Sequence, residues 1–374
     1  MISKYPQLFE FIEALLPDNF SQSQVGMSGA TTNPRLVAQA VLESPHQWSD
    51  YLTSLSGRLT EAERARRLYD QVIVEGARQL HPLWISSRRT LGWLSAQIEG
   101  GEDMDERALV ARGLQLARLA PNVMIKVPGS EQGYRAIEQL VAKGCSINNT
   151  FCFSVSQAAA CLKAIHDGRL RAQLQGVSTE RARYVISFMI GRLGAQEEFA
   201  RQASQRRLCL TAADRRWAEI LVYQAIQALL RRRPTPARLL LCSLKIDTDV
   251  QGREHCWHLQ RTGADCTLYT LTPQIIEFLI RSQQQGRPVV PANGWVQVPK
   301  RVLNRLMAIP YFNQAYFEGD LAPADFASQP AFITASNDAR EGTQRLSAFV
   351  QQTGDGAARP VIPPASDAPM EHWS

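Results

Sequence analysis

The sequence predicts an α/β fold in which eight parallel strands and their connecting helices close into a (β/α)8 barrel. Strand-like and helical patterns alternate along the chain, which is typical of parallel strands joined by helical crossovers. Eight candidate strands occur, near residues 15, 27, 85, 125, 148, 187, 241 and 268. A doubly wound sheet would require a glycine-rich phosphate loop after its first strand, and neither GxGxxG nor GxxxxGK(S/T) is present. The fold class is therefore a TIM barrel, followed by a C-terminal helical extension.

The chain length and composition fit one large domain. The 374 residues are 45% hydrophobic and 20% charged, as expected for a globular protein with an extensive core. We expect one barrel over residues 1–352, with an insertion or extension at residues 283–330. Residues 353–374 are rich in Ala, Pro and Gly and are predicted to be disordered.

Charge and cysteine content narrow the functional classes. The net charge of +6 suits a phosphorylated small-molecule substrate, and the arginine runs follow helical patterns, which favours solvated helix faces over a nucleic-acid surface. The seven cysteines include no CxxC pair, which indicates free thiols in a reducing compartment. Neither a signal peptide nor an apolar run of membrane-spanning length is recognisable. We therefore expect a cytoplasmic protein without nucleic-acid or membrane partners.

The N-terminal half supplies helices and the first strands of the predicted barrel. Apolar spacing predicts a short helix over residues 5–14, a first strand at 15–16 and helices over 35–43 and 58–80. The β-rich run 83–87 is interpreted as the third strand. A helix over 104–119 leads into the strand around Lys126, and Ser130 then caps a helix that ends near residue 143.

The C-terminal half continues the alternation. Strands are predicted at residues 145–154, 184–190, 238–245 and 265–271, with helices over 155–164 and 213–231. Thr272-Pro-Gln opens a further helix, because proline suits the first helical turn. Beyond residue 283 the pattern weakens into a loop, short helices over 297–320 and a terminal helix over 331–351.

One lysine stands inside an apolar strand, close to its end. Residues 122–129 read Asn-Val-Met-Ile-Lys-Val-Pro-Gly, with Lys126 as the only charged residue. A buried ammonium is costly unless it is paired, has a depressed pKa or takes part in chemistry. Barrel enzymes carry catalytic groups at the C-terminal ends of their strands, so Lys126 is a candidate Schiff-base nucleophile. A lysine that snorkels out of the strand end is the alternative.

Five segments stand in the order and contexts of one enzyme family. They are Ala30-Thr-Thr-Asn-Pro34, Met124-Ile-Lys-Val-Pro128, Ser146-Ile-Asn-Asn-Thr-Phe-Cys-Phe-Ser154, Ile186-Ser-Phe-Met-Ile-Gly-Arg192 and Cys242-Ser-Leu-Lys245. Together they resemble the transaldolase family over residues 15–282, and most closely its longer bacterial members, in which a lysine follows the seventh strand.

The resemblance implies a transferase of the pentose phosphate pathway. Such an enzyme moves a three-carbon ketol unit from a ketose phosphate to an aldehyde acceptor. A lysine Schiff base carries the unit, so neither a cofactor nor a metal is expected. The expected partner is a small sugar-phosphate-like substrate, and a homodimer is compatible with the resemblance.

Three catalytic residues are carried over from matching motifs. Lys126 matches the Schiff-base lysine of the family. Thr150 matches the fifth-strand threonine that helps to bind the catalytic water. Asp18 is matched to the aspartate of the first strand, which acts as acid and base.

Five further residues are carried over as substrate ligands. Asn33 matches the asparagine that holds the dihydroxyacetone moiety, and Asn148 belongs to the fifth-strand pair. Ser187 and Arg192 match the substrate serine and the phosphate-binding arginine of the sixth strand. Lys245 falls where a second phosphate-binding cation sits.

Two positions depart from the family's pattern. Gly29 stands directly before Ala-Thr-Thr-Asn-Pro, where the family has an aspartate. The family's third strand ends in Ser-x-Glu, whose glutamate activates water, and in Ile85-Ser-Ser-Arg88 an arginine takes that place. Arginine stays protonated and cannot shuttle protons. We expect Arg88 to point into the barrel mouth near Lys126 and Thr150, where it would lower the pKa of the lysine and attract an anion. An outward Arg88 that begins a solvated turn is the alternative.

Two other functions stay open. A specialised Schiff-base aldolase acting on a non-sugar or carboxylated substrate would explain Arg88. A catalytically silent barrel that serves as a binding or scaffold subunit would explain the missing glutamate. His255-Cys-Trp-His258 could place two imidazoles on one helix face, but a structural zinc site needs four ligands and no second pair stands at a suitable distance.

Overall fold

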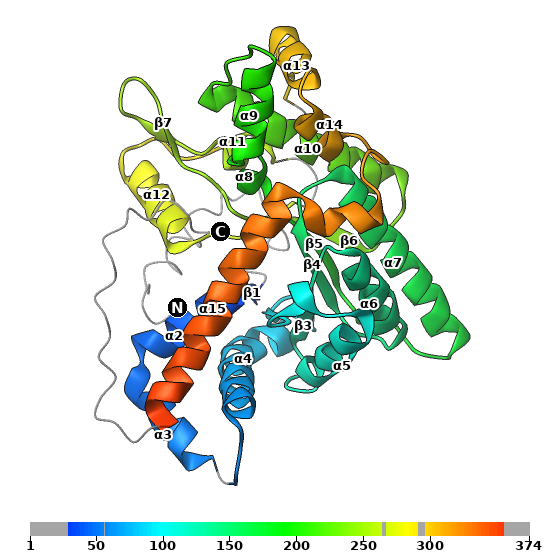
Figure 1. Ribbon diagram of the computed structural model, residues 1–374, viewed down its shortest axis with the longest axis vertical. Coiled ribbons are helices and arrows are strands. Elements are labelled where there is room, and N and C mark those ends of the chain that lie inside the picture. Colours follow the sequence, from blue (N-terminus) through cyan, green and yellow to red (C-terminus); the bar gives the residue numbers. More distant parts are fainter. Residues whose placement is uncertain (1–28, 56, 264–266, 291–295, 355–374) are drawn as a thin grey trace.

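The computed structural model describes residues 29–55, 57–263, 267–290 and 296–354 (Figure 1). Within these residues seven parallel strands form one sheet in the order β1-β2-β3-β4-β5-β6-β9. The strands are β1 (Gly29–Thr31), β2 (Trp93–Gln97), β3 (Val123–Pro128), β4 (Ile147–Cys152), β5 (Tyr184–Phe188), β6 (Ala237–Leu241) and β9 (Leu268–Tyr269). Successive strands are neighbours, so the strand order never reverses as it does in a doubly wound sheet. The sheet curls as it does in a barrel.

Helices connect the strands and extend the chain beyond the last of them. They are α2 (Pro34–Glu43), α3 (Pro45–Ser54), α4 (Glu61–Ser86), α5 (Glu106–Ala117), α6 (Glu131–Ala142), α7 (Val155–Leu174), α8 (Ile190–Leu193), α9 (Glu197–Gln205), α10 (Ala212–Arg232), α11 (Trp257–Arg261), α12 (Pro273–Gln284), α13 (Lys300–Met307), α14 (Pro310–Tyr316) and α15 (Pro330–Gly354). Short 3-10 helices lie at η2 (Gly101–Asp103) and η3 (Pro323–Ser328), and an antiparallel pair joins β7 (Asp247–Thr248) to β8 (Glu254–His255). Within the described residues, none of the helices combines the length and the hydrophobicity that a membrane-spanning segment requires.

The alternation predicted from the sequence is confirmed for most strands. The strands expected near residues 125, 148, 187, 241 and 268 are β3, β4, β5, β6 and β9, and the strand expected near residue 27 is β1. The first expected strand, near residue 15, and Asp18 lie outside the described residues. The tail expected to be disordered also lies outside them, from residue 355 onward.

The strand expected at residues 83–87 is wrong. These residues end α4, a helix that begins with a capping box in which the Glu63 carboxylate accepts the Thr60 N–H at 2.8 Å. The helix continues through Pro82 because its inner face remains buried, and Trp84 there packs edge-on against Trp93. The strand that follows β1 in the sheet is therefore β2, ten residues later than expected at its start.

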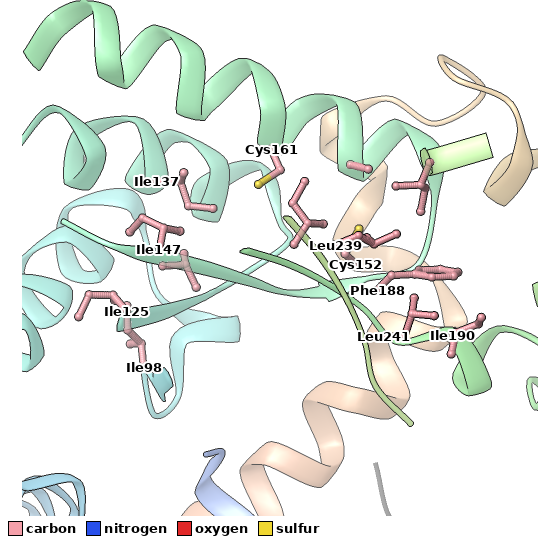
Figure 2. Close-up of a cluster of buried hydrophobic side chains, with 14 of the residues drawn as sticks. Ile98, Ile125, Ile137, Ile147, Cys152, Cys161, Phe188, Ile190, Leu239 and Leu241 are labelled. Carbon is pink, nitrogen blue, oxygen red and sulfur yellow. The ribbon is translucent and has the colours of Figure 1, made fainter. Parts of the chain in front are cut away.

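The outer face of the sheet packs against its helices. Figure 2 shows Ile125, Ile147, Phe188 and Leu241 from four strands meeting Cys161 from α7 in one apolar layer. Residues alternate between the two faces of a strand, so their immediate neighbours in sequence face the inside of the curled sheet. This alternation turns Ser95, Gln97, Lys126, Asn148 and Ser187 toward the concave face, whereas Asn149 faces the helices and contacts Tyr134 of α6.

Helix α15 crosses the open end of the sheet (Figure 1, orange to red). Phe332 packs edge-on against Phe151 at the end of β4, with ring centroids 5.3 Å apart. Farther along, Gly342 lies against α2, where a Cβ would come within 2.3 Å of the Arg35 nitrogen. The C-terminal extension therefore packs over the ends of the strands, at the face where barrel active sites occur.

Candidate active site

Lys126 lies at the C-terminal end of β3 on the concave face. Its Cα is in register with Gln97 of β2 and Asn148 of β4. The side chain is buried, and Nζ donates a hydrogen bond to the main-chain oxygen of Thr32 at 3.1 Å. Burial lowers the pKa of Lys126 from 10.5 to about 8, although the neighbouring Cys242 raises it. The neutral amine, which is the nucleophilic form, is thus accessible near neutral pH.

A chain of polar side chains runs beside Lys126 across three strands. The hydroxyl of Ser187 donates to the Asn148 side-chain oxygen at 2.6 Å. The Asn148 amide group in turn donates to the hydroxyl of Ser95 at 3.0 Å. All three residues are buried, so these hydrogen bonds fix the orientation of the Asn148 amide.

Thr150 lies in β4, and Asn33 follows the end of β1. Thr150 is buried two residues beyond Asn148 and is in register with Pro128. Phe151 then adopts a φ of 53° in the left-handed region, at a shift in the register between β4 and β5. Asn33 caps α2, because its side-chain oxygen accepts the Leu36 N–H at 2.8 Å.

Arg192 and Lys245 converge from neighbouring strands. Arg192 lies on α8, just after β5, and Lys245 lies just after β6. Gly191 permits the approach, since a Cβ there would lie 1.9 Å from the Ser243 carbonyl oxygen. Burial lowers the pKa of Lys245, and the charge of Arg192 lowers it further. Two cations are thereby placed at one end of the sheet.

A cavity of about 730 Å³ opens beside these cations. Its walls include Arg192, Ser243 and Lys245 from the barrel and Ile333 and Thr334 from α15. Ser243 has a φ of 60°, and its buried hydroxyl has no hydrogen-bond partner among the described residues. The cavity thus presents Arg192 and Lys245 to an anionic group, and its wall also carries Glu197 and Glu198, the latter paired with Arg201.

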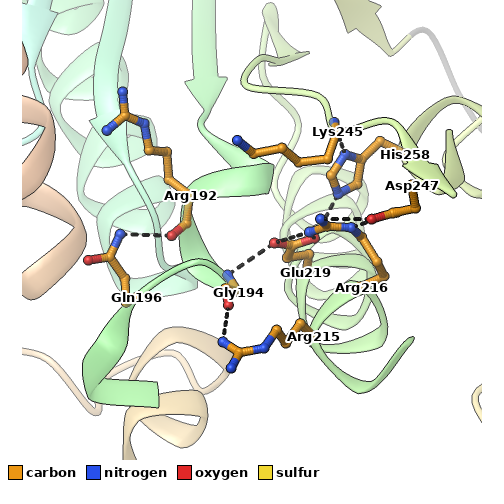
Figure 3. Close-up of polar contacts among 9 residues, drawn as sticks. All are labelled: Arg192, Gly194, Gln196, Arg215, Arg216, Glu219, Lys245, Asp247 and His258. Atoms are coloured by element: carbon orange, nitrogen blue, oxygen red, sulfur yellow. Dashed lines mark hydrogen bonds and ion pairs between the residues drawn. The ribbon is translucent and has the colours of Figure 1, made fainter. Parts of the chain in front are cut away.

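A buried charge network holds the backbone beneath Lys245 (Figure 3). Glu219 of α10 accepts the Gly194 N–H at 3.0 Å and a hydrogen bond from Arg216 at 2.8 Å. His258 contacts Glu219 through Nε2 at 2.7 Å, and its Nδ1 accepts the Lys245 N–H at 3.1 Å. Burial alone would raise the pKa of Glu219, but His258 and Arg216 together hold it below its ordinary value.

The C-terminal helix brings a carboxylate to the same place. Asp338 of α15 forms an ion pair with the guanidinium of Arg192. The Arg192 side chain is 11% exposed and the Asp338 side chain 30% exposed. This contact joins the extension to the barrel and was not indicated by the sequence.

The expected position of Arg88 is wrong. Arg88 lies in the turn after α4 with a φ of 52°, is exposed, and precedes β2. Lys126 stands beside the C-terminal end of β2, whereas Arg88 stands before its N-terminal end. The two residues are therefore at opposite ends of the sheet, and the outward alternative is correct. The error follows from the misassigned strand.

The residue that sequence reasoning missed is Gln97. β2 ends in Ser95-Ala-Gln97, which is the Ser-x-Glu pattern with glutamine in place of glutamate. Gln97 is 3% exposed and, two residues from Ser95, shares its face of the strand. The signal was available, because the run from Trp93 to Gln97 is strand-like and follows the turn residue Gly92.

The two histidines near residue 256 do not gather a set of metal ligands. Both ring nitrogens of His258 are engaged, by Glu219 and by the Lys245 N–H. In the part of the chain that is described, no group of three or more His, Cys, Asp or Glu side chains could hold a metal ion.

Comparison with known proteins gives one consistent family. The model of the family described as Transaldolase/Fructose-6-phosphate aldolase matches residues 10–308. A transaldolase of Thiobacillus denitrificans is 31% identical over 208 residues, which cover 54% of this chain and 57% of that protein. Transaldolase 1 of Streptomyces avermitilis is 30% identical over 171 residues, 45% of each chain, and a transaldolase of Campylobacter jejuni is 28% identical over 196 residues.

The two kinds of match differ in how much they cover. The chain spans about half the length of the curated relatives that it matches. The family model, in contrast, extends over most of this chain and over β1 to β9 with their helices. The protein belongs to the transaldolase/fructose-6-phosphate aldolase family.

Proposed function

We propose that the protein transfers a three-carbon ketol unit from a ketose phosphate to an aldehyde through a Schiff base on Lys126. The supporting observation is the environment of Lys126, whose buried amine has a pKa of about 8. A lysine that only snorkelled would keep its ammonium in water, whereas this amine is buried and hydrogen-bonded to the Thr32 carbonyl.

The reaction can be written with every proton accounted for. The Lys126 amine attacks the ketose carbonyl carbon, and uptake of one proton with loss of water gives a protonated imine. A base then removes the proton of the C4 hydroxyl, the C3–C4 bond breaks, and the aldehyde leaves. The bonding electrons pass to the imine and give an enamine. The enamine adds to the acceptor aldehyde, which takes up a proton, and water releases the new ketose from Lys126.

The polar chain beside Lys126 suits a substrate rich in hydroxyl groups. Ser187 and Asn148 present donors and acceptors in fixed orientations along the concave face. Asn33 stands next to Thr32, whose carbonyl already contacts the Lys126 amine. We assign these three residues to the carbon chain of the ketol unit.

The phosphate of the substrate is assigned to the cavity beside Arg192. A guanidinium group can donate two parallel hydrogen bonds to two oxygens of one phosphate, and Lys245 adds a second positive charge. Ser243, whose side chain is buried, belongs to the same cavity wall. A sugar phosphate that reached from there to Lys126 is the kind of donor used in the pentose phosphate pathway.

The proton transfers are the part that departs from the family. Asp18 lies outside the described residues, and we keep it as the proposed acid and base. Thr150 is proposed to hold the hydrolytic water, but Gln97 on the same concave face cannot accept a proton as glutamate does. This substitution is the observation that keeps a catalytically silent barrel as the second candidate. The alternative of a carboxylated substrate is no longer supported, because Arg88, on which it rested, lies at the opposite end of the sheet from Lys126.

A pair of measurements separates these candidates. Incubation with fructose 6-phosphate and erythrose 4-phosphate should give glyceraldehyde 3-phosphate and sedoheptulose 7-phosphate. Borohydride in the presence of fructose 6-phosphate or dihydroxyacetone should add one three-carbon unit to the peptide that contains Lys126. A Lys126→Met variant serves as the control and should give neither product nor adduct. A wild-type chain that remains unmodified by every ketose would establish the silent barrel instead.

A further inference from the structure

The ion pair between Arg192 and Asp338 lies where the substrate phosphate is proposed to bind. Arg192 is held by α8 at the end of β5, while Asp338 belongs to a helix that follows all the barrel strands. Asp338 is thus not part of the barrel strands whose ends carry the site. A carboxylate and a phosphate both use the same guanidinium donors, so the two groups compete for Arg192.

Packing fixes the position of Asp338. On the same helix, Phe332 packs against Phe151 and Gly342 lies against Arg35, on either side of Asp338 in sequence. Arg340 forms a two-bond ion pair with Asp103, with distances of 2.9 and 2.7 Å. Helix α15 is therefore held at several points that do not involve Asp338. This packing places residue 338 beside Arg192. An uncharged side chain of the same size at position 338 would therefore lie there as well.

We propose that Asp338 is a specificity-determining residue that competes with the substrate phosphate for Arg192. This inference rests on the proposed function of the site. A phosphate that binds through the Nη2 group of Arg192 must displace Asp338 from that donor, and a phosphate bound through the other donors lies close to the Asp338 carboxylate. Both effects weaken the binding of phosphorylated substrates and leave the binding of unphosphorylated substrates unchanged. Asp338 therefore disfavours one class of substrate.

Asp338→Asn tests the proposal without changing the size of the side chain. We expect KM for fructose 6-phosphate to fall roughly fivefold, because a partly exposed ion pair contributes about 1 kcal/mol and that free energy corresponds to a fivefold change in affinity. KM for dihydroxyacetone or unphosphorylated fructose should stay within about twofold, because those substrates do not need Arg192. Arg340→Gln is the matched control, since it removes a different ion pair of α15 and should change neither KM.

Binding of inorganic phosphate gives a second readout that needs no catalysis. Calorimetric titration should show roughly fivefold tighter binding to Asp338→Asn than to the wild type or to Arg340→Gln. Weaker binding to Asp338→Asn would mean that Asp338 orients Arg192 for phosphate, and unchanged binding would mean that the two groups do not compete. An equal effect of Arg340→Gln would assign the change to displacement of α15. Each of these three results overturns the proposal.

The same titration separates this inference from the proposed function. A protein that binds phosphate more tightly in Asp338→Asn but never traps a ketose on Lys126 retains the competition and loses the Schiff-base reaction. A protein that traps a ketose but shows no response to Asp338→Asn retains the reaction and loses the competition. Unfolding temperatures of both variants, measured without phosphate, verify that each is folded.

Discussion

The ε-amino group of Lys126 donates a hydrogen bond to the main-chain oxygen of Thr32, 3.1 Å away, and among the described residues no carboxylate is bonded to it. A carbonyl oxygen accepts a hydrogen bond from an ammonium group or from a neutral amine, so this contact does not require Lys126 to be protonated. Burial therefore dominates and lowers the pKa of Lys126 to about 8. The contact also ties the end of β3 to the residue that precedes Asn33.

This pKa predicts the pH dependence of adduct formation at Lys126. The neutral amine is the reactive form, so the rate of trapping with dihydroxyacetone and cyanoborohydride should rise from pH 6.5 and level off above about pH 8. Lys163 is an internal control, because its side chain is 75% exposed and its pKa is raised by Asp167. Labelling of its peptide should still be rising at pH 9. Parallel pH profiles for the two peptides would contradict the assignment of Lys126.

Arg192→Ala should affect phosphorylated substrates selectively. Loss of a charge-assisted hydrogen bond costs roughly 1.5–3 kcal/mol, so KM for fructose 6-phosphate should rise about tenfold or more. KM for dihydroxyacetone should change little. Arg201→Ala is the control, since Arg201 lines the same cavity but is paired with Glu198 on an exposed helix. Equal losses for both substrates would remove Arg192 from the phosphate site.

Local sequence signals predicted the strand with Lys126 because that strand is nearly self-sufficient. Its apolar residues, the following Pro128-Gly129 and the Ser130 cap all lie within a few positions, and the structure has β3 and α6 where they were expected. The error at residues 83–87 has the opposite cause. The β-forming residues 83–87 suggested a strand, but burial of Trp84 against Trp93 continues α4 past Pro82. Tertiary packing outweighed local propensity there.

Contacts between distant segments could not be predicted from one sequence. The ion pair of Arg192 with Asp338 joins residues 146 positions apart, and no local pattern marks Asp338 as different from other acidic residues of a terminal helix. His258 illustrates the same limit. A zinc site at His255 and His258 is not expected because no second pair of ligands stands nearby, but no local pattern indicates that the ring nitrogens of His258 contact Glu219 on α10 and the backbone of Lys245.

Replacement of Glu219 by Gln should destabilise the protein. The native carboxylate is fully buried among His258, Arg216 and the Gly194 N–H, and removing one partner of a buried ion pair costs roughly 3 kcal/mol. The pKa of Glu219 is lowered in the folded protein, so its contribution is present above the unfolded pKa of 4.5 and is lost as the pH falls through the folded value. Urea unfolding at pH 7 should show the difference in unfolding free energy, and this difference should shrink as the pH falls below 4.5.

A surface carboxylate is the matched control for that measurement. Glu341→Gln removes an exposed ion pair with Arg345 on α15, and such pairs contribute about 0–1 kcal/mol. A Glu219→Gln variant as stable as Glu341→Gln would show that the buried network is balanced by its own desolvation. In that case the support of Lys245 by His258 would not depend on the charge of Glu219.

Replacement of Gln97 by Glu restores the carboxylate that the family carries at the end of its third strand. Gln97 is buried, is in register with Lys126, and lies on the concave face with Ser95. A carboxylate there can accept a proton from water held by Thr150, and positioned general bases contribute at least about 100-fold in favourable cases. We expect transfer between fructose 6-phosphate and erythrose 4-phosphate to be faster in Gln97→Glu.

The same replacement should move the pH profile of Lys126. A negative charge next to an ammonium favours the protonated lysine, so the trapping rate of Gln97→Glu should level off above the wild-type value of about pH 8. Gln97→Met is the control, since it keeps the length of the side chain and adds no charge. It should leave the plateau near the wild-type pH and should not accelerate transfer. If Gln97→Glu shifts the plateau upward without faster turnover, the carboxylate reaches Lys126 but not the water, and Thr150 is not the residue that holds it.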